Sequence, residues 1–161
     1  MTYVRKGIGI VDSGTILKDK ENTGLGLYVQ CEVNDSNLYV CNFHGMSRPV
    51  EKLDDPMRLK ASHALIDFFE TKDGIKIIGG DFNIFPETES IGMFSKYNYR
   101  DLISDYSIET TRNRLAWEMY PDTKQYFSDY VFISKDTVIT DFTVPVNEVS
   151  DHLPLVLQIE I

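Results

Sequence analysis

The stretch Lys76-Ile77-Ile78-Gly79-Gly80-Asp81-Phe82-Asn83 joins a short apolar run to a polar end. Residues 76 to 79 predict a buried strand, and tandem glycines at its exit let the backbone approach a neighbouring segment closely. Asp81 and Asn83 lie two residues apart, so extended backbone would point both side chains to the same side. Alone, such a Gly-Asp-x-Asn segment is more often a simple turn, so its function depends on what the chain places beside it.

Segments before this stretch predict a hairpin and a long helix. Leu25 to Val33 alternates apolar and polar residues, and after turn residues 34–37 the run Leu38 to His44 predicts the return strand. Two aspartates before Pro56 favour a helix start, and Gly74 predicts its C-terminal cap.

The remaining elements complete the expected order. They are a strand at residues 8–11, a loop at 13–24, a short helix and loop at 86–96, a helical turn at 99–103, and strands at 130–134, 137–144 and 153–161. A hairpin, a helix, a strand and a final run of strands predict an α/β fold, called α+β in some schemes, of two packed mixed sheets with outer helices.

Composition narrows the class of function. The chain has 161 residues with 42% hydrophobic residues, enough for one domain with a real core. Lys and Arg total 16 against 25 Asp and Glu, which gives a net charge of -9. This balance argues against tight nonspecific binding of duplex DNA. It does not exclude a nuclease, because a divalent cation can turn an acidic cleft into a phosphate site.

Nothing in the sequence predicts a membrane protein. No apolar run approaches the roughly 20 residues needed to span a bilayer, and no basic amphipathic segment suggests a membrane surface as partner. Residues 1–6 lack the apolar core of a signal peptide. Cys31 and Cys41 alone cannot form a disulfide framework or a zinc site. We therefore expect a reduced, cytoplasmic setting by default.

A second polar cluster lies near the C-terminus. Ser150-Asp151-His152 directly precedes the apolar run 153–159, and a carboxylate beside a histidine at a strand entrance is suited to metal binding or proton transfer. His44 ends one predicted strand and Asp129 begins another. Taken singly, each has an ordinary explanation as a solvated histidine or a cap.

Their combination and order resemble the endonuclease/exonuclease/phosphatase superfamily, the DNase-I-like metal-dependent phosphoesterases. The matching segments are the strand ending in His44, Gly79–Asn83, Ser128–Ser134 and Ser150–Leu155. The resemblance runs from about Tyr3 to the C-terminus. It implies a partial DNase-I-like layered sandwich and phosphoester hydrolysis with Mg²⁺, or alternatively Mn²⁺, as the cofactor.

The chain departs from the family pattern at its start. That pattern opens with a strand ending in Asn, then a helix, then a strand with a metal-binding Glu, and this sequence has neither segment. Tyr3 to Ile8 resembles a strand from the middle of the family domain. We therefore expect residues 1–161 to be the C-terminal portion of a single domain, whether as a piece of a longer protein, a truncated reading frame or a natural fragment.

The resemblance implies a role for each matching residue. Asp151 and Asp81 correspond to metal-side carboxylates, and Asp81 also to the group that positions or deprotonates the attacking water. His152 corresponds to a histidine that contacts the scissile phosphate or activates water, and Asp129 to the carboxylate that orients it. Asn83 corresponds to a donor to phosphate oxygens.

Three further residues carry weaker assignments. The resemblance implies that His44 protonates the leaving group or contacts the phosphate. Arg112 and Arg114 are candidates for binding a substrate phosphate through bidentate contacts, and a solvated loop is an equal alternative for both.

The substrate stays open, because one fold hosts many functions. We expect a phosphodiesterase or nuclease-type activity in the whole protein, with a nucleic acid or nucleotide as substrate. One alternative is a phosphomonoesterase acting on a small phosphorylated ligand. The other is a catalytically inactive fragment that binds a partner or forms a homo-oligomer through its truncated sheet.

Overall fold

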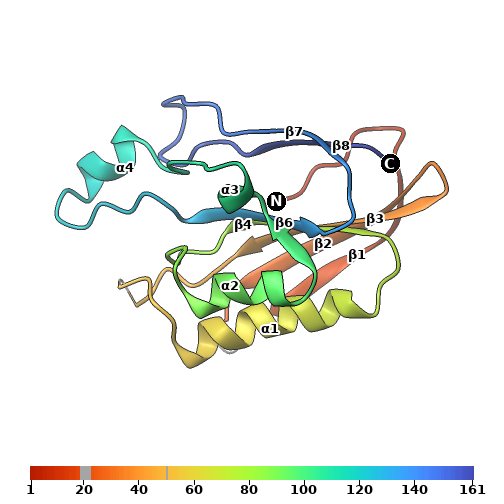
Figure 1. The fold of residues 1–161 in the computed structure, drawn as a ribbon, viewed down its shortest axis with the longest axis horizontal. Helices are drawn as coiled ribbons and strands as arrows, with labels where there is room; N and C mark the ends of the chain where they lie inside the picture. Colours follow the sequence, from red (N-terminus) through yellow and green to blue (C-terminus); the bar gives the residue numbers. More distant parts are fainter. Residues whose placement is uncertain (19–22, 50) are drawn as a thin grey trace.

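Two sheets and four helices make up the computed structural model, which describes residues 1–18, 23–49 and 51–161. The larger sheet has six strands in the order β1-β2-β3-β4-β6-β5 (Figure 1). These are β1 (Gly9–Lys18), β2 (Leu25–Val33), β3 (Ser36–His44), β4 (Ile75–Asp81), β5 (Tyr99–Asp101) and β6 (Asp129–Ser134). Among the described strands of this sheet β3 and β4 pair parallel and the other pairs are antiparallel, so the sheet is mixed as predicted.

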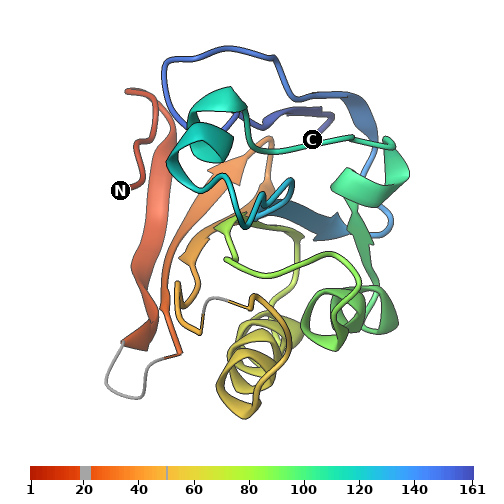
Figure 2. The same ribbon diagram turned by 90° about the vertical axis from the view of Figure 1, so that its left-hand side faces the viewer.

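The second sheet consists of β7 (Ile139–Thr143) and β8 (Val156–Ile159). The two strands pair antiparallel, so the prediction that both sheets are mixed was wrong for this one. It lies on one side of the large sheet, and the two longer helices lie on the other, as Figure 2 also shows. The predicted α/β arrangement of packed sheets with outer helices is confirmed.

The outer helices are α1 (Pro56–Glu70) and α2 (Glu89–Lys96), and their starts share a pair of aspartates. Asp55 accepts hydrogen bonds from the first backbone N–H groups of α1, as a capping residue does. Asp54 instead accepts from the backbone of Glu89 and Ser90 and so caps α2. Two adjacent acidic residues therefore fix both helices against each other.

Aromatic side chains join the helices to the large sheet. Phe69 of α1 is fully buried and meets Tyr39 of β3 edge to face. Phe94 of α2 is fully buried and stacks on Phe132 of β6, with ring centroids 3.9 Å apart. Burial of such rings contributes most of the apolar stabilisation of this layer, so the strand ends beyond it have a rigid base.

Some sequence-based expectations about local structure were wrong. Residues 13–18 were expected in a loop but continue β1, because they pair with β2; residues 19–22 of that expected loop lie outside the described residues. Gly74 does not cap α1, which ends at Glu70; its φ of +125° instead allows a turn into β4. Tyr99–Asp101 forms β5 rather than a helical turn, and α3 (Leu102–Asp105) follows it.

One helix was not expected at all. The short helix α4 (Arg114–Met119) lies in the segment between α3 and β6, and Asn113 caps it by accepting a hydrogen bond from Leu115. Among the described residues, no helix has the length and apolar character needed to cross a membrane.

Candidate active site

The ends of three neighbouring strands meet at one end of the large sheet. Parallel pairing of β3 with β4 places His44 opposite Asp81, and antiparallel pairing of β4 with β6 places Asp81 opposite Asp129. The sheet register thus brings together three polar residues that lie up to 85 positions apart in the sequence, counted from His44 to Asp129. The three residues come together because their strands pair in this register, and no local sequence pattern around any one of them requires it.

Gly80 explains why the strand exit carries tandem glycines. Its φ is +133°, and a Cβ atom there would lie 2.1 Å from the backbone oxygen of Phe43. No other residue type tolerates both the backbone conformation and the contact. The predicted close approach of backbone at this point is therefore confirmed, and it sets Asp81 directly beside the end of β3.

Asp129 and His152 form a hydrogen-bonded pair. His152 Nδ1 lies 2.8 Å from Asp129 Oδ2, which also accepts a hydrogen bond from Ser128 Oγ at 2.7 Å. A carboxylate only accepts, so Nδ1 carries the proton, and Nε2 points toward Asp81 and Arg112. This hydrogen bond raises the pKa of His152, against the opposing effects of burial and of the nearby Arg112 charge.

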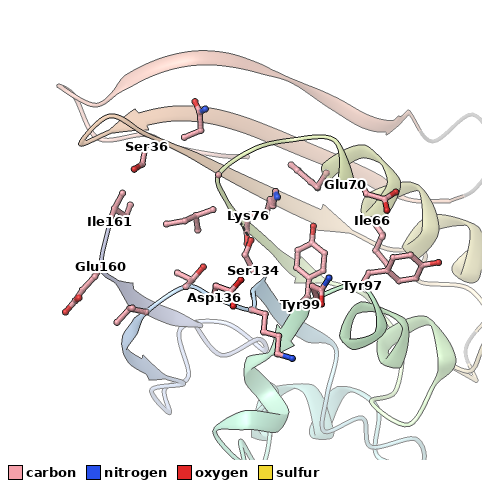
Figure 3. Close-up of a pocket in the computed structure, with 18 of the residues that line it drawn as sticks. Ser36, Ile66, Glu70, Lys76, Tyr97, Tyr99, Ser134, Asp136, Glu160 and Ile161 are labelled. Carbon is pink, nitrogen blue, oxygen red and sulfur yellow. Dashed lines mark hydrogen bonds between the residues drawn. The ribbon is translucent and has the colours of Figure 1, made fainter.

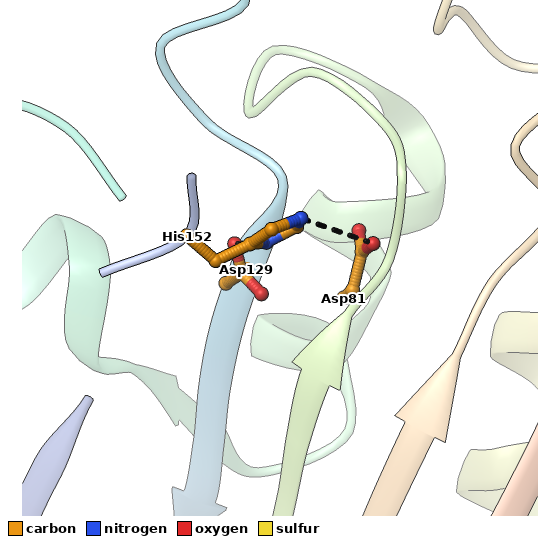
Figure 4. A group of neighbouring side chains, drawn as sticks. All are labelled: Asp81, Asp129 and His152. Atoms are coloured by element: carbon orange, nitrogen blue, oxygen red, sulfur yellow. Dashed lines mark hydrogen bonds and ion pairs between the residues drawn. The ribbon is translucent and has the colours of Figure 1, made fainter. Parts of the chain in front are cut away.

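Asp81 faces the imidazole from the neighbouring strand (Figure 4). Its Oδ2 lies 3.9 Å from His152 Nε2 and 3.8 Å from His44 Nε2, while Oδ1 accepts a hydrogen bond from the backbone N–H of Asn83. Burial raises the pKa of the Asp81 carboxyl, and the negative charge of Asp129 raises it further. The His44 side chain is 73% exposed, so it borders the site on the solvent side.

Arg112 completes the cluster from the segment before α4. Its Nη2 donates to Asp151 Oδ2 at 2.7 Å, and its Nη1 lies 3.0 Å from His152 Nε2 and donates to Ser128 Oγ at 3.3 Å. The side chain is only 9% exposed. A buried guanidinium with carboxylate and imidazole partners is held in one orientation, so its positive charge is fixed beside the histidine.

Arg114 does not join this cluster. Its guanidinium binds Glu148 with N–O distances of 3.0 and 2.9 Å and also pairs with Glu118, at the exposed surface of α4. Of the two predicted arginines, the structure therefore brings only Arg112 to the other candidate residues. The chain pattern could not separate them, because both lie in one polar segment.

Asn83 lies beside Asp81 in an unexpected conformation. The strand ends at Asp81, and Asn83 has a φ of +56°, so the extended backbone expected for residues 81–83 is wrong. The Asn83 side chain is buried, with Oδ1 accepting from Lys52 Nζ at 2.8 Å and Nδ2 donating to the Gly45 oxygen at 3.4 Å. Sequence reasoning missed Lys52, since nothing near it in the chain indicates a polar site.

The donor atoms of the cluster bear on metal binding. Asp81, Asp129 and His152 each offer one ligand atom, and these lie within 4.8 Å of one another. Asp129 Oδ2 and His152 Nδ1 already bind each other, which leaves Asp81 Oδ2 as the best placed hard oxygen. Mg²⁺ needs few protein carboxylates because it keeps several waters, so the cluster fits such a cation. Asp151 would join it only on leaving Arg112.

A separate cleft of about 970 Å³ lies at the opposite end of the large sheet (Figure 3). It is lined by residues at the start of β4 and the end of β6, among them Lys76 and Ser134, together with Glu70, Asp136 and Glu160. None of the clustered residues lines it. Its lining mixes both signs of charge without a histidine or a converging set of carboxylates, so we place the candidate chemistry at the strand ends instead.

Solved structures share this fold. A mannosyl-6-phosphatase from Bacteroides thetaiotaomicron matches 96% of the chain at 17% identity and a TM-score of 0.68. The human Nocturnin catalytic domain, with a bound sulfate anion, matches 95% at 19% identity and 0.69. An endonuclease/exonuclease/phosphatase from Bacteroides vulgatus matches 99% at 12% identity and 0.70. No family model and no curated protein sequence matches the chain.

These matches confirm the DNase-I-like fold predicted from the motifs. They account for nearly all of this chain, whereas the chain spans 67%, 60% and 68% of the lengths of the three structures. A part of each neighbour therefore has no counterpart among residues 1–161.

Proposed function

We propose that the cluster at the ends of β3, β4 and β6 is the hydrolytic centre of a metal-dependent phosphoesterase. The observation that supports this most strongly is the placement of His152. It bonds Asp129 through Nδ1 and presents Nε2 toward Asp81 and Arg112. An oriented imidazole beside a carboxylate and a fixed cation is suited to the hydrolysis of an anionic ester.

Each side chain has a part in this proposal. Asp81 orients the attacking water and accepts its proton, since it is the carboxylate on the open side of the imidazole. His152, held by Asp129, contacts the phosphate through Nε2 in its doubly protonated form, because a phosphate oxygen only accepts. Arg112 and the carboxamide of Asn83 stabilise the charge that grows on the phosphate oxygens. His44, exposed at the rim, is placed to protonate the leaving group.

The residues proposed to hold Mg²⁺ are Asp81 and Asp151, with Mn²⁺ as an alternative ion. When bound, the cation would supply positive charge that polarises the phosphoryl group. Asp151 has a cationic partner in Arg112, so binding of metal and release of this ion pair would be linked. Arg112 would then be free to contact the substrate.

We propose a phosphodiester of a nucleotide or short nucleic acid as substrate. The net charge of -9 disfavours long duplex DNA and favours a small or single ester. A phosphomonoester is the second candidate, because one structure with this fold is a mannosyl-6-phosphatase. The two candidates differ in the charge of the phosphate at the centre, and this difference is measurable.

The test compares hydrolysis of bis-p-nitrophenyl phosphate and p-nitrophenyl phosphate with Mg²⁺, Mn²⁺ or EDTA. The proposal expects turnover only with metal, faster on the diester, and its loss in His152→Gln. His63→Gln is the matched control, since His63 is an exposed histidine on α1 whose ring packs against Tyr97, outside the cluster. Preference for the monoester would support the second candidate.

Absence of turnover in folded protein would instead support a non-catalytic role. The chain spans only about two thirds of the structures it resembles. β1 is an edge strand of the large sheet, and an edge strand can pair with a second copy. Sedimentation analysis of the same sample distinguishes this outcome. A concentration-dependent homodimer without hydrolysis would favour the self-associating fragment.

A further inference from the structure

The loop between β3 and α1 is braced by a buried arginine. Arg58 is only 5% exposed and donates to the backbone oxygens of Leu53 at 2.5 Å, Pro49 at 2.9 Å and Met46 at 3.4 Å. Three carbonyl groups held by one guanidinium fix the described residues of this loop on both sides of position 50. Lys52 lies within this braced segment, so its position is set by the loop as well as by its own contacts.

Lys52 is also tied to the segment that follows Asn83. Its backbone oxygen accepts a hydrogen bond from the Phe85 N–H at 3.0 Å, and its φ is +55°. A non-glycine residue adopts this left-handed conformation where surrounding contacts hold it. The two loops that border the cluster are thus joined at Lys52 and at Asn83, each in a left-handed conformation.

The ammonium group of Lys52 points to the candidate active site. Nζ donates to Asn83 Oδ1 and to the Ser47 oxygen, both at 2.8 Å. An ammonium has three hydrogens, and its contacts with the described residues use two of them. Burial lowers the pKa of Lys52, the negative charge of Asp81 opposes this, and the positive charges of Arg58 and Arg112 add to it. The charges of Asp81 and Arg112 therefore act on the Lys52 ammonium.

We propose that Lys52 is a second anion-binding residue of this site, which binds a phosphate oxygen together with Arg112. By holding Asn83 Oδ1, Lys52 also turns the Asn83 NH₂ group away from itself. Among the described residues that group has one long contact, 3.4 Å, to the Gly45 oxygen, and it can donate to the same anion. Lys52 contacts Asn83, the Asn83 backbone N–H bonds Asp81, and Asp81 lies 3.9 Å from the His152 nitrogen that Arg112 contacts. The ammonium, the carboxamide and the guanidinium thus belong to one connected cluster, and each can donate to a tetrahedral oxyanion.

This inference rests on the proposed function for its substrate but can be measured without turnover. Inorganic phosphate is titrated into the metal-free protein with EDTA at constant ionic strength, followed by amide chemical shifts. We expect Lys52→Met to weaken phosphate binding about tenfold. Lys52→Arg should retain most of the affinity. Lys96→Met is the matched control, because Lys96 is an exposed lysine at the end of α2.

Equal phosphate affinity in wild type and Lys52→Met would overturn the inference, as would a wild-type protein that binds no phosphate. Should Lys52→Met fail to fold, Lys52→Cys treated with bromoethylamine restores an ammonium at nearly the same place. Cys31 and Cys41 are buried, which protects them in the folded protein. Recovery of phosphate binding on alkylation supports the inference, and no recovery overturns it.

Failure of the proposed function has a different signature. Phosphate binding that depends on Lys52, without any hydrolysis, would support the proposed anion site and refute the proposed hydrolase activity. Metal-dependent hydrolysis with an unchanged KM and unchanged phosphate affinity in Lys52→Met would support the hydrolase and refute the role of Lys52 in anion binding.

Discussion

Replacing Asp129 with Asn tests whether the Asp129–His152 pair organises the site. The substitution keeps the shape of the side chain but removes the charge that the imidazole Nδ1 contacts at 2.8 Å. Asp129 is buried, so little solvent screens this contact. The Asn variant should lower the pKa of His152, because the hydrogen bond from Asp129 is the largest influence that raises it and Arg112 then acts unopposed by that bond.

The size of the effect follows from the kind of bond that is lost. A hydrogen bond to a charged group contributes about 1.5–3 kcal/mol, so hydrolysis should fall about 10-fold to about 150-fold. Stability should fall as well, with a defined pH dependence. Because the folded-state pKa of His152 is raised, the pair stabilises the fold fully below the ordinary histidine value of about 6.5, and this contribution is lost as pH rises through the folded-state pKa.

The assay combines histidine NMR titration with urea unfolding at about pH 5 and about pH 9, on either side of histidine titration. Asp136→Asn is the control, since Asp136 is exposed and lines the cleft at the other end of the sheet. Asp129→Asn should be less stable than wild type by a larger margin at the lower pH. A margin that is equal at both pH values, or larger at the higher one, would refute the reasoning.

Three other sets of substitutions distinguish residues that act in the candidate site from residues that stabilise the fold. Gly80→Ala should destabilise the fold by about 1–3 kcal/mol in urea unfolding, because it combines a strained φ with a backbone clash; an unchanged midpoint would contradict the close approach. Phe94→Ala should cost about 3–5 kcal/mol in the same assay, since the ring is fully buried and stacked; a loss under about 1 kcal/mol would contradict that packing. Arg112→Gln should weaken phosphate binding and hydrolysis, whereas Arg114→Gln should leave both unchanged because its charge is bound by exposed glutamates; equal loss in the two variants would refute the assignment of Arg112.

Much of the fold could be predicted from local signals. Pro56 after two aspartates marks the start of α1, and alternation marks the β2–β3 hairpin. The extension of β1 to Lys18 could not be predicted, because Gly14 and the polar run that begins at Lys18 indicate a loop, and Ile16 becomes a core residue through the pairing with β2. Tyr99–Asp101 likewise becomes a strand through its partner β6, so tertiary pairing overrides weak local preference there.

The residues of the candidate site that lie in sequence motifs could be predicted, and those outside such motifs could not. Asp81 and Asp129 stand at strand ends that the sequence marks, His152 lies in the Ser-Asp-His motif that precedes β8, and the structure brings the three together. Lys52 reaches Asn83 across 31 positions, and its loop carries no motif. The choice of Arg112 over Arg114 depends on how the segment before α4 turns, which composition does not determine.

The most direct test of the central claim is hydrolysis of an activated phosphodiester with Mg²⁺ by wild type, Asp81→Asn and the control Asp122→Asn. Asp122 is exposed in the loop after α4, so its variant should match wild type. If the strand-end cluster is the hydrolytic centre, wild type turns over, EDTA abolishes the activity and Asp81→Asn loses it. Metal-dependent turnover that persists at the wild-type rate in Asp81→Asn would contradict the account.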